Sequence, residues 1–225
     1  MTIIFVPQGA ESKAVRNGLS RVNQSITLVS IPISSKALIK YLQEWYKTVD
    51  LSKPQSHALV MGLCGGLTHD YKVGDVVLYE SCIYQDDFRK CDIDLTNYID
   101  SQLEQKVSRV TALMSDSIIF SKVEKLLLSK SGASVVDMEG FTLLDFLNSV
   151  GVKVAMLRVV SDGCEHDLPN LNSALSPKGT LLALPLLLGM LRQPIAATRL
   201  IYGSLRGLKV LENLTANVFQ NFHIS

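Results

Sequence analysis

The sequence predicts a three-layer α/β/α sandwich around a mixed, mostly parallel central sheet. Short apolar runs typical of buried strands alternate with segments of helical periodicity. Two of these runs end in glycine or acidic residues, and in open α/β sheets the ligand lies at the carboxyl ends of the strands. The chain has 225 residues, 47% of them hydrophobic, which is enough for a substantial core. The sequence shows no repeat or linker-like tract, so we expect one domain over residues 1–225.

Three strands and two helices are expected before the first glycine-rich segment. The strands are expected at 3–6, 26–31 and 58–61, and the helices over 11–19 and after Ser34 and Ser35. Either serine can cap the second helix, because a side-chain oxygen there accepts a hydrogen bond from the first turn. The apolar residues of this helix have the spacing of a buried face, at Ala37, Leu38, Tyr41, Leu42, Trp45 and Val49.

The rest of the sandwich is expected to follow the same alternation. The remaining strands are expected at 75–79, 107–113, 135–138 and 152–160, and the helices over 117–130 and 140–150. Gly151 ends the last of these helices. The strand at 152–160 is nearly continuous in apolar residues, as expected for a strand buried on both faces.

Charge and cysteine content narrow the classes of function. A formal net charge of +1 does not suggest nucleic-acid binding. The four cysteines form no CxxC pair and no cluster with zinc-ligand spacing, so no metal site is expected. The first residues lack the features of a signal peptide, which favours the cytoplasm and reduced thiols. The longest apolar run, 181–191, is shorter than the roughly 20 residues that a membrane span needs.

Three segments at expected strand ends carry residues suited to chemistry. The glycine-rich segment at 62–66 lets backbone N–H groups approach an oxyanion, although such a segment on its own more often marks a tight strand-to-loop turn. Asp137 and Glu139 fall on the same side of their strand, where a carboxylate can accept from ribose hydroxyls or can favour a helix N-terminus. Asp162 follows a buried strand and is either a proton donor at the mouth of the sheet or a turn cap.

Together these motifs resemble the nucleoside phosphorylase superfamily, which includes the methylthioadenosine/S-adenosylhomocysteine nucleosidases. The resemblance rests on GLCGGL at 62–67, KVGDVV at 72–77, VVDMEG at 135–140 and RVVSDG at 158–163, and it covers roughly residues 3–162. The Asp167-Leu168-Pro169 segment and the tail beyond it are more similar to the hopanoid-associated phosphorylases, a branch proposed to remove adenine from adenosylhopane.

The resemblance implies a role for each matching residue. Asp162 would protonate the purine at N7, with Ser161 beside it, and Glu11 would be a second acid. Glu139 would bind the ribose hydroxyls. The other implied contacts are with the sugar (Met138, Leu63), the base (Ile118, Ile119) and the phosphate or water position (Cys64, Gly65, Gly66). The family also implies a homo-oligomer that needs no cofactor, with phosphate as an open co-substrate.

The chain departs from the family pattern around the nucleophile. The nucleosidases have a serine where this chain has Leu63, and Met61 stands where some phosphorylases have an arginine. The segment at 31–35 replaces a glycine-containing loop. Phosphate and water therefore both stay open. Leu63 makes the 5′ side of the sugar more apolar, which suits a bulky or apolar substituent there.

The leading interpretation is phosphorolysis of a purine nucleoside, with a lipid-linked adenosine such as adenosylhopane as the favoured substrate. The alternatives are hydrolysis of methylthioadenosine or S-adenosylhomocysteine, and a nucleoside-binding module that has lost turnover. Release of adenine with and without phosphate separates the three.

The tail is basic and amphipathic. Residues 168–211 contain no acidic residue, and Arg192, Arg199 and Arg206 recur at seven-residue spacing, which keeps them on one helical face. The helical segment expected at 181–222 therefore resembles helices that contact a membrane surface. The alternative is a helix packed on the domain or at a subunit interface. Membrane docking would place the protein at the periphery of the membrane.

Overall fold

The computed structural model describes residues 2–24, 26–49, 57–104, 107–174, 176 and 182–220. Eight strands are present in the described residues: β1 (Thr2–Pro7), β2 (Thr27–Ile31), β3 (His57–Gly66), β4 (Val76–Tyr84), β5 (Asp87–Lys90), β6 (Ser108–Met114), β7 (Val135–Asp137) and β8 (Lys153–Asp162). The helices are α1 (Ala10–Leu19), α2 (Ser35–Thr48), α3 (Ile93–Ser101), α4 (Lys122–Leu128), α5 (Gly140–Ser149), α6 (Ala183–Arg192) and α7 (Pro194–Gln220). Short 3₁₀ turns occupy Ser129–Ser131 and Asn172–Ala174.

The strands form one mixed sheet in the order β2-β1-β3-β7-β6-β4-β5, and β8 pairs with both β3 and β4. Neighbours pair in parallel in β1–β2, β1–β3, β3–β8, β4–β6 and β6–β7, and antiparallel in β3–β7, β4–β5 and β4–β8. The expected mixed, mostly parallel sheet is therefore confirmed. Because β8 bridges β3 and β4, the strands β3, β7, β6, β4 and β8 close into a ring, which the sequence did not predict.

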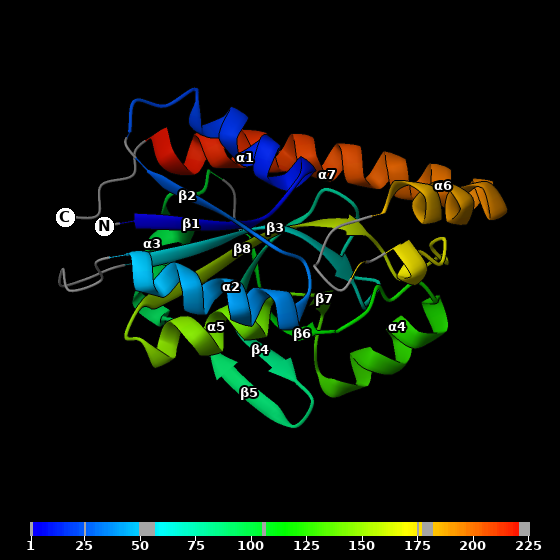
Figure 1. Ribbon diagram of the computed structural model, residues 1–225, viewed down its shortest axis with the longest axis horizontal. Coiled ribbons are helices and arrows are strands. Elements are labelled where there is room, and N and C mark those ends of the chain that lie inside the picture. The colour runs from blue at the N-terminus through cyan, green and yellow to red at the C-terminus, as the bar shows by residue number, and fades with distance from the viewer. Residues whose placement is uncertain are drawn as a thin grey trace.

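Helices cover both faces of the sheet, as Figure 1 shows, with α1 and α7 above and α2 and α5 below. Successive residues of a strand point to opposite faces, so Ile3 and Phe5 join the core with α2 and α5, while Ile4 and Val6 join the core with α1 and α7. The expected apolar face of α2 is confirmed, since Leu38 and Leu42 are fully buried. The three-layer arrangement is confirmed as well.

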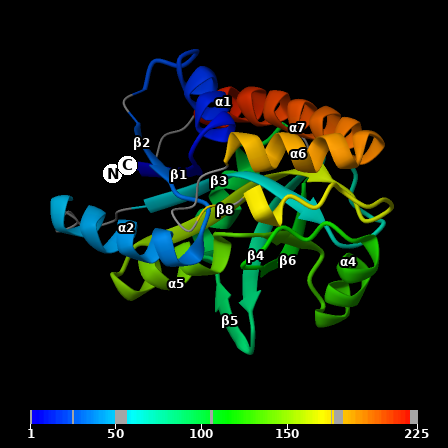
Figure 2. The same cartoon turned by 45° about the vertical axis from the view of Figure 1, so that its right-hand side comes forward.

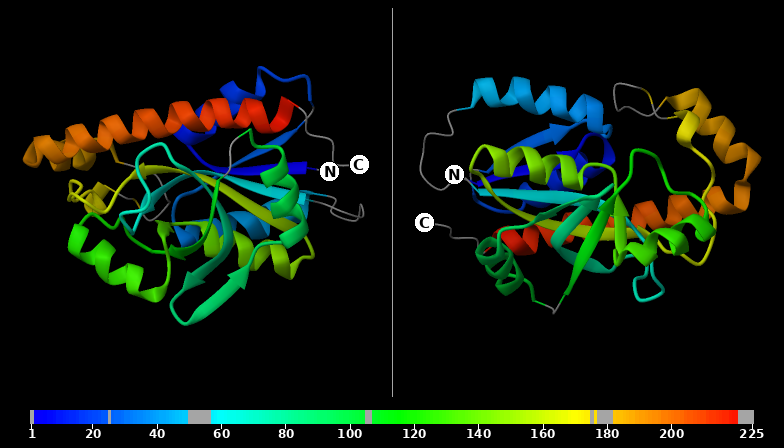
Figure 3. Two further views of the ribbon diagram at one scale, coloured as in Figure 1. Left: turned by 180° about the vertical axis from the view of Figure 1, so that it is seen from behind. Right: turned by 90° about the horizontal axis from the view of Figure 1, so that it is seen from below.

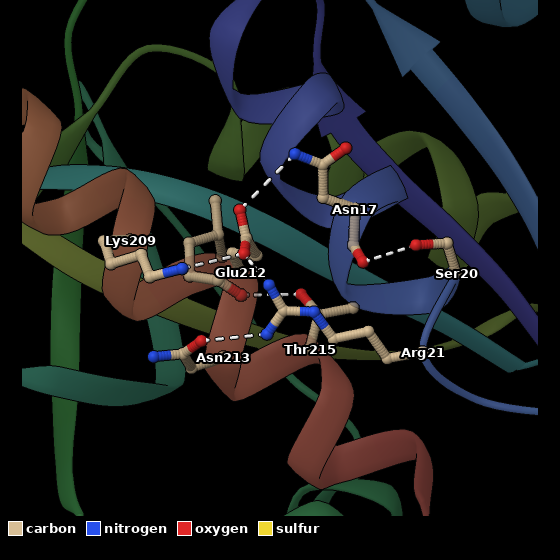
Figure 4. A network of polar contacts seen from close by, with 8 residues as sticks. Asn17, Ser20, Arg21, Lys209, Glu212, Asn213 and Thr215 are labelled. Carbon is tan, nitrogen blue, oxygen red and sulfur yellow. Dashed lines mark hydrogen bonds and ion pairs between the residues drawn. The ribbon is translucent and has the colours of Figure 1, made fainter.

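The second half of α7 is anchored on α1 by the polar network of Figure 4. Glu212 accepts hydrogen bonds from Asn17 (3.4 Å) and Lys209 (3.0 Å) and pairs with Arg21. The helices approach closely at Gly18, where a Cβ would lie 2.4 Å from the Glu212 carbonyl oxygen. The first half of α7 lies beside α6, away from this anchor (Figures 2 and 3). Within the described residues, no helix is long and apolar enough to span a membrane.

Several boundaries differ from those expected. The helix expected at 117–130 begins only at Lys122, because the Asn172 side chain takes both backbone groups of Ile118 and holds that segment out of the helix. β3 continues past Met61 to Gly66, since β8 pairs with it throughout. The tail forms two helices separated at Gln193, and residues 181, 221 and 222 of the expected segment lie outside the described residues.

Smaller differences affect the other elements. The strand expected at 135–138 ends at Asp137, and the strand expected at 75–79 extends to Tyr84, where it turns into β5. Neither β5 nor α3 was expected. Ser34 occupies the cap position of α2 but makes no side-chain capping hydrogen bond.

Candidate active site

The carboxyl ends of β3 and β8 and the end of β7 meet beside the first turn of α1. A cavity of about 250 Å³ lies there. It is lined by every candidate site residue except Gly66: Glu11, Leu63, Cys64, Gly65, Ile118, Ile119, Met138, Glu139, Ser161 and Asp162. Gly66 is buried directly behind them, where a Cβ would lie 3.4 Å from the Asp162 carbonyl oxygen. Segments far apart in the chain thus contribute to one cavity.

One fully buried guanidinium organises the carboxylates at the closed end of this cavity. Arg158 on β8 places Nη2 3.3 Å from Asp137 Oδ2 and 3.7 Å from Glu139 Oε2. Both carboxylates therefore face the same way, as the alternation along the strand indicated. Asp137 also accepts a hydrogen bond from the Gly140 N–H at 2.9 Å. Since Asp137 satisfies the start of α5, Glu139 makes no capping bond and its carboxyl group can face the cavity.

Glu11 joins this group from the start of α1. Its Oε2 accepts a hydrogen bond of 2.6 Å from the Leu63 N–H. The contact depends on Gly62, because a Cβ there would lie 2.4 Å from both Glu11 Oε2 and Arg158 Nη1. Burial raises the pKa of Glu11 to about 7, although Arg158 and the Leu63 N–H oppose the shift. A carboxyl group that titrates near neutrality can act as an acid or a base at physiological pH.

Glu139 is buried more deeply, with 4% of its surface exposed. Burial raises its pKa well above the ordinary range, and repulsion from Asp137 and Glu11 adds to the rise while Arg158 opposes it. A carboxyl group of this kind can both donate and accept hydrogen bonds, which matches the two functions of a ribose hydroxyl.

Asp162 ends β8 at the open side of the cavity. Its Oδ1 accepts a hydrogen bond of 2.7 Å from the Ser161 hydroxyl, which also lies 3.2 Å from the Cys64 carbonyl oxygen. Its Oδ2 pairs with Lys125, a fully buried residue of α4 that no sequence pattern had singled out. Lys125 also donates a 2.9 Å hydrogen bond to the Gly163 carbonyl oxygen.

A second, larger cavity of about 570 Å³ lies on the other side of Asp162. The two cavities share Ser161, Asp162 and Leu168 in their walls. The far wall of the larger one belongs to the exposed half of α7, with Arg199, Tyr202 and Arg206. The site therefore adjoins the basic part of the tail.

The arrangement of these strand ends is matched by a known family. The model of the phosphorylase superfamily matches residues 55–177, more than half of the chain. This chain belongs to the phosphorylase superfamily. The match covers the segments with Leu63, Glu139 and Asp162, and α1 with Glu11 lies before it.

Solved structures share the fold of this superfamily member across nearly its whole length. The 5′-methylthioadenosine/S-adenosylhomocysteine nucleosidase of Helicobacter pylori has a TM-score of 0.67 and 14% identity over 95% of this chain and 94% of its own. The futalosine hydrolase of the same organism has a TM-score of 0.67 and 13% identity over 96% of both chains. A Borrelia burgdorferi protein described as such a nucleosidase and bound to adenine has a TM-score of 0.64 and 14% identity over 95% and 98%. No curated protein sequence matches the chain.

The described residues contain no group of three or more His, Cys, Asp or Glu side chains placed to hold a metal ion. The four cysteines are free and buried. Burial raises the pKa of Cys64, the one thiol that lines the smaller cavity, so it stays protonated at neutral pH.

Proposed function

We propose that this protein cleaves the N-glycosidic bond of an adenine nucleoside. The proposal rests on one observation. Asp162, Glu139 and Glu11 line the same cavity at the strand ends of a phosphorylase-superfamily fold. Asp162 protonates the leaving base at N7, which is needed because a purine anion leaves poorly. General acids of this kind contribute roughly 10²–10⁴-fold to a rate.

Glu139 holds the ribose, because a buried carboxyl group with a raised pKa can donate a hydrogen bond to a hydroxyl group and accept one from it. Met138 and Leu63 line the sugar region, and Ile118 and Ile119 line the region of the base. Asn172 fixes the base-binding segment through both backbone groups of Ile118, at 2.8 and 3.2 Å. The site is thus rigid on the side where the adenine is recognised.

The electrostatics of the cavity favour water over phosphate as the nucleophile. The guanidinium of Arg158 at the closed end is already paired with Asp137, so it is not free to bind an entering phosphate. Water would meet Glu11, whose pKa is raised to about 7 and which can accept its proton. The phosphorolysis favoured from the sequence stays a prediction that the product assay decides.

The 5′ substituent of the substrate is proposed to be apolar. Leu63 lines the cavity, and α7 approaches it at Gly207, where a Cβ would lie 3.0 Å from Leu63 Cδ2. A lipid-linked adenosine such as adenosylhopane fits this environment, and methylthioadenosine is the smaller candidate. Both are adenine nucleosides, so the glycosidic step would be the same.

The test is a product assay on the purified protein with adenosine, methylthioadenosine and an adenosine that carries a long alkyl chain at C5′. Adenine is measured by chromatography with and without phosphate, and the sugar product is identified as free or phosphorylated. Free sugar, formed without phosphate and absent with Asp162→Asn, is the expected result. Phosphorylated sugar would establish phosphorolysis, and binding of the nucleosides without release of adenine would establish a binding module.

We also propose that α6 and the first half of α7 contact an anionic membrane. No residue of α6 is buried, and large apolar side chains on the two helices are exposed, including Leu184 (67%), Leu191 (67%) and Ile195 (71%). Arg192, Arg199 and Arg206 lie among them, and no ion pair within the described residues involves these arginines. A two-fold contact through this face would bring the same arginines of two copies together, which disfavours a second copy as the occupant.

Sedimentation with anionic and neutral vesicles tests this contact. Each arginine near an anionic surface contributes about 1 kcal/mol, so replacing all three by Glu should lower binding at least ~100-fold. The matched control replaces Lys36, Lys40 and Lys47 of α2 by Glu, an equal charge change on the opposite face. Equal loss of vesicle binding in both variants, or no binding by the wild type at low salt, would refute the contact.

Light scattering on the same samples tests the homo-oligomer implied by the family. A monomer at micromolar concentration would exclude it.

A further inference from the structure

Lys125 is the most deeply buried ammonium group near the candidate active site. Its side chain has no exposed surface, and it pairs with Asp162 Oδ2 and donates to the Gly163 carbonyl oxygen at 2.9 Å. Placing an ammonium group out of contact with water is costly unless it is paired and hydrogen-bonded. The position of this lysine is therefore tied to the group proposed to protonate the base.

Within the described residues, Lys125 is the cation that forms an ion pair with Asp162. The titratable groups on the elements packed against the pair are Cys64 on β3, His69 and Asp70 on the loop after β3, and Cys164 and Glu165 after β8. His69 lies 4.0 Å from Glu165 and 3.6 Å from the Cys164 sulfur, on the exposed side of the pair. The ammonium of Lys125 and the carboxylate of Asp162 thus form one coupled unit.

We propose that Lys125 is a positioning residue that stores the proton which Asp162 delivers to the base. The inference rests on the proposed cleavage of an adenine nucleoside. It assigns to Asp162 the role of a relay, because its Oδ2 is held against the ammonium group of Lys125.

The proton and the electron pair move in a balanced sequence. The C1′–N9 bond breaks, and its electron pair passes into the purine ring. N7 then takes the proton from the Asp162 carboxyl group, whose proton comes from Lys125 Nζ as that N–H bond breaks. The step leaves a neutral base, an Asp162 carboxylate, a neutral amine and a ribosyl cation. Water adds to this cation at C1′ as Glu11 takes the water proton, and solvent reprotonates the amine after product leaves.

Two variants separate proton storage from charge pairing. Lys125→Arg keeps the charge but does not release a proton, since the guanidinium pKa is above about 12. We expect it to lower the rate of adenine release about 100-fold, with KM within threefold. Lys125→Met removes the charge at similar length. Lys130→Met, an exposed position just after α4, is the control and should match the wild type.

The pH profile gives the readout that a structural role would not change. In the wild type the ammonium group of Lys125 can supply the proton that Asp162 passes on. In Lys125→Met the proton must reside on Asp162 itself, so activity is retained at low pH and lost as pH rises. We expect the basic limb of kcat/KM to move down by at least about two pH units. An unchanged profile, or a Lys125→Arg variant that keeps a third of the activity, would overturn the proposal.

Carboxyl-carbon NMR tests the pair without any turnover. The Asp162 signal is identified by its absence in Asp162→Asn, and it is followed from pH 5 to 9 in the wild type. We expect the signal of an ionised carboxylate throughout this range, and a signal that titrates at higher pH in Lys125→Met, where the neighbouring positive charge is lost. A protonated Asp162 in the wild type at pH 7 would overturn the proposal even if either variant failed to fold. If no nucleoside is cleaved while these titrations are found, the proposed function fails and the pairing of Lys125 with Asp162 stands.

Discussion

The raised pKa of Glu11 predicts a loss of stability as pH rises, which the variant Glu11→Gln should remove. The folded protein holds the Glu11 proton up to a pKa of about 7, against an ordinary value of 4.5. Between these two values the unfolded chain is ionised at this residue while the folded protein is not. Stability therefore falls as pH rises through this window, because folding there requires uptake of a proton.

The size of the effect follows from the shift. A rise from 4.5 to about 7 corresponds to about 3 kcal/mol at roughly 1.4 kcal/mol per pKa unit. Glu139 acts in the same direction, since burial raises its pKa as well. Repulsion from Glu11 contributes to that rise, so the difference between wild type and variant measures Glu11 together with its effect on Glu139.

The assay is urea unfolding at several values of pH from 4.5 to 8. Trp45, the one tryptophan of the chain, packs edge-on against Phe5 with ring centroids 5.0 Å apart and reports the loss of the core. We expect the wild type to lose about 3 kcal/mol more than Glu11→Gln between the ends of this range. A stability difference that is the same at every pH would refute the reasoning, because Glu11 would then not retain its proton on folding.

Three further predictions concern other residues of the site. Asp162→Asn should lower adenine release by at least ~100-fold, and a rate within threefold of the wild type would exclude it as the general acid. Glu139→Gln should weaken the preference for ribosides over 2′-deoxyribosides, since it alters a hydrogen bond that contributes roughly 0.5–1.5 kcal/mol. An unchanged ratio of kcat/KM would contradict the ribose contact. Gly62→Ala should lower the free energy of unfolding by about 2 kcal/mol or more, because its Cβ would lie 2.4 Å from Glu11 and from Arg158. Gly163→Ala is the control and should cost much less, since the nearest atom to its Cβ would be 3.7 Å away. Equal losses of stability in thermal unfolding would show that the close approach at Gly62 is relieved easily.

The sequence predicted those parts of the fold in which local pattern and burial agree. β1 alternates between two cores, β8 is buried on both faces, and both were recognisable from their apolar residues. The glycine and acidic residues that follow the strands indicated the segment 62–66, Asp137, Glu139 and Asp162 as candidates, and the family resemblance added the others, Glu11, Ile118 and Ile119 among them. Their convergence on one cavity depends on the ring of strands, which arises from the pairing of β8 with β3 and β4 and is not visible in local sequence.

Two misses have identifiable physical causes. In α4 the usual pattern is inverted, since Lys125 is buried while Val123 (60%) and Leu127 (57%) are exposed, so nothing in the sequence indicated Lys125 as part of the site. The late start of α4 depends on Asn172, 54 residues away in the chain. By contrast, α3 carried a readable signal that was overlooked, because Asp92 caps it through the Leu95 N–H and Leu95 and Ile99 form its buried face.

The small residues of α7 have a mechanical consequence. A Cβ at Gly203 would lie 2.1 Å from the Ser161 carbonyl oxygen, so the helix axis approaches the backbone beside Asp162 with no side chain between them. With 27 residues, α7 is about 40 Å long, and its far end is fixed on α1. The helix therefore packs directly on the residue that precedes Asp162, and we expect a tilt of its exposed end to shift that carboxyl group, because no loop lies between them.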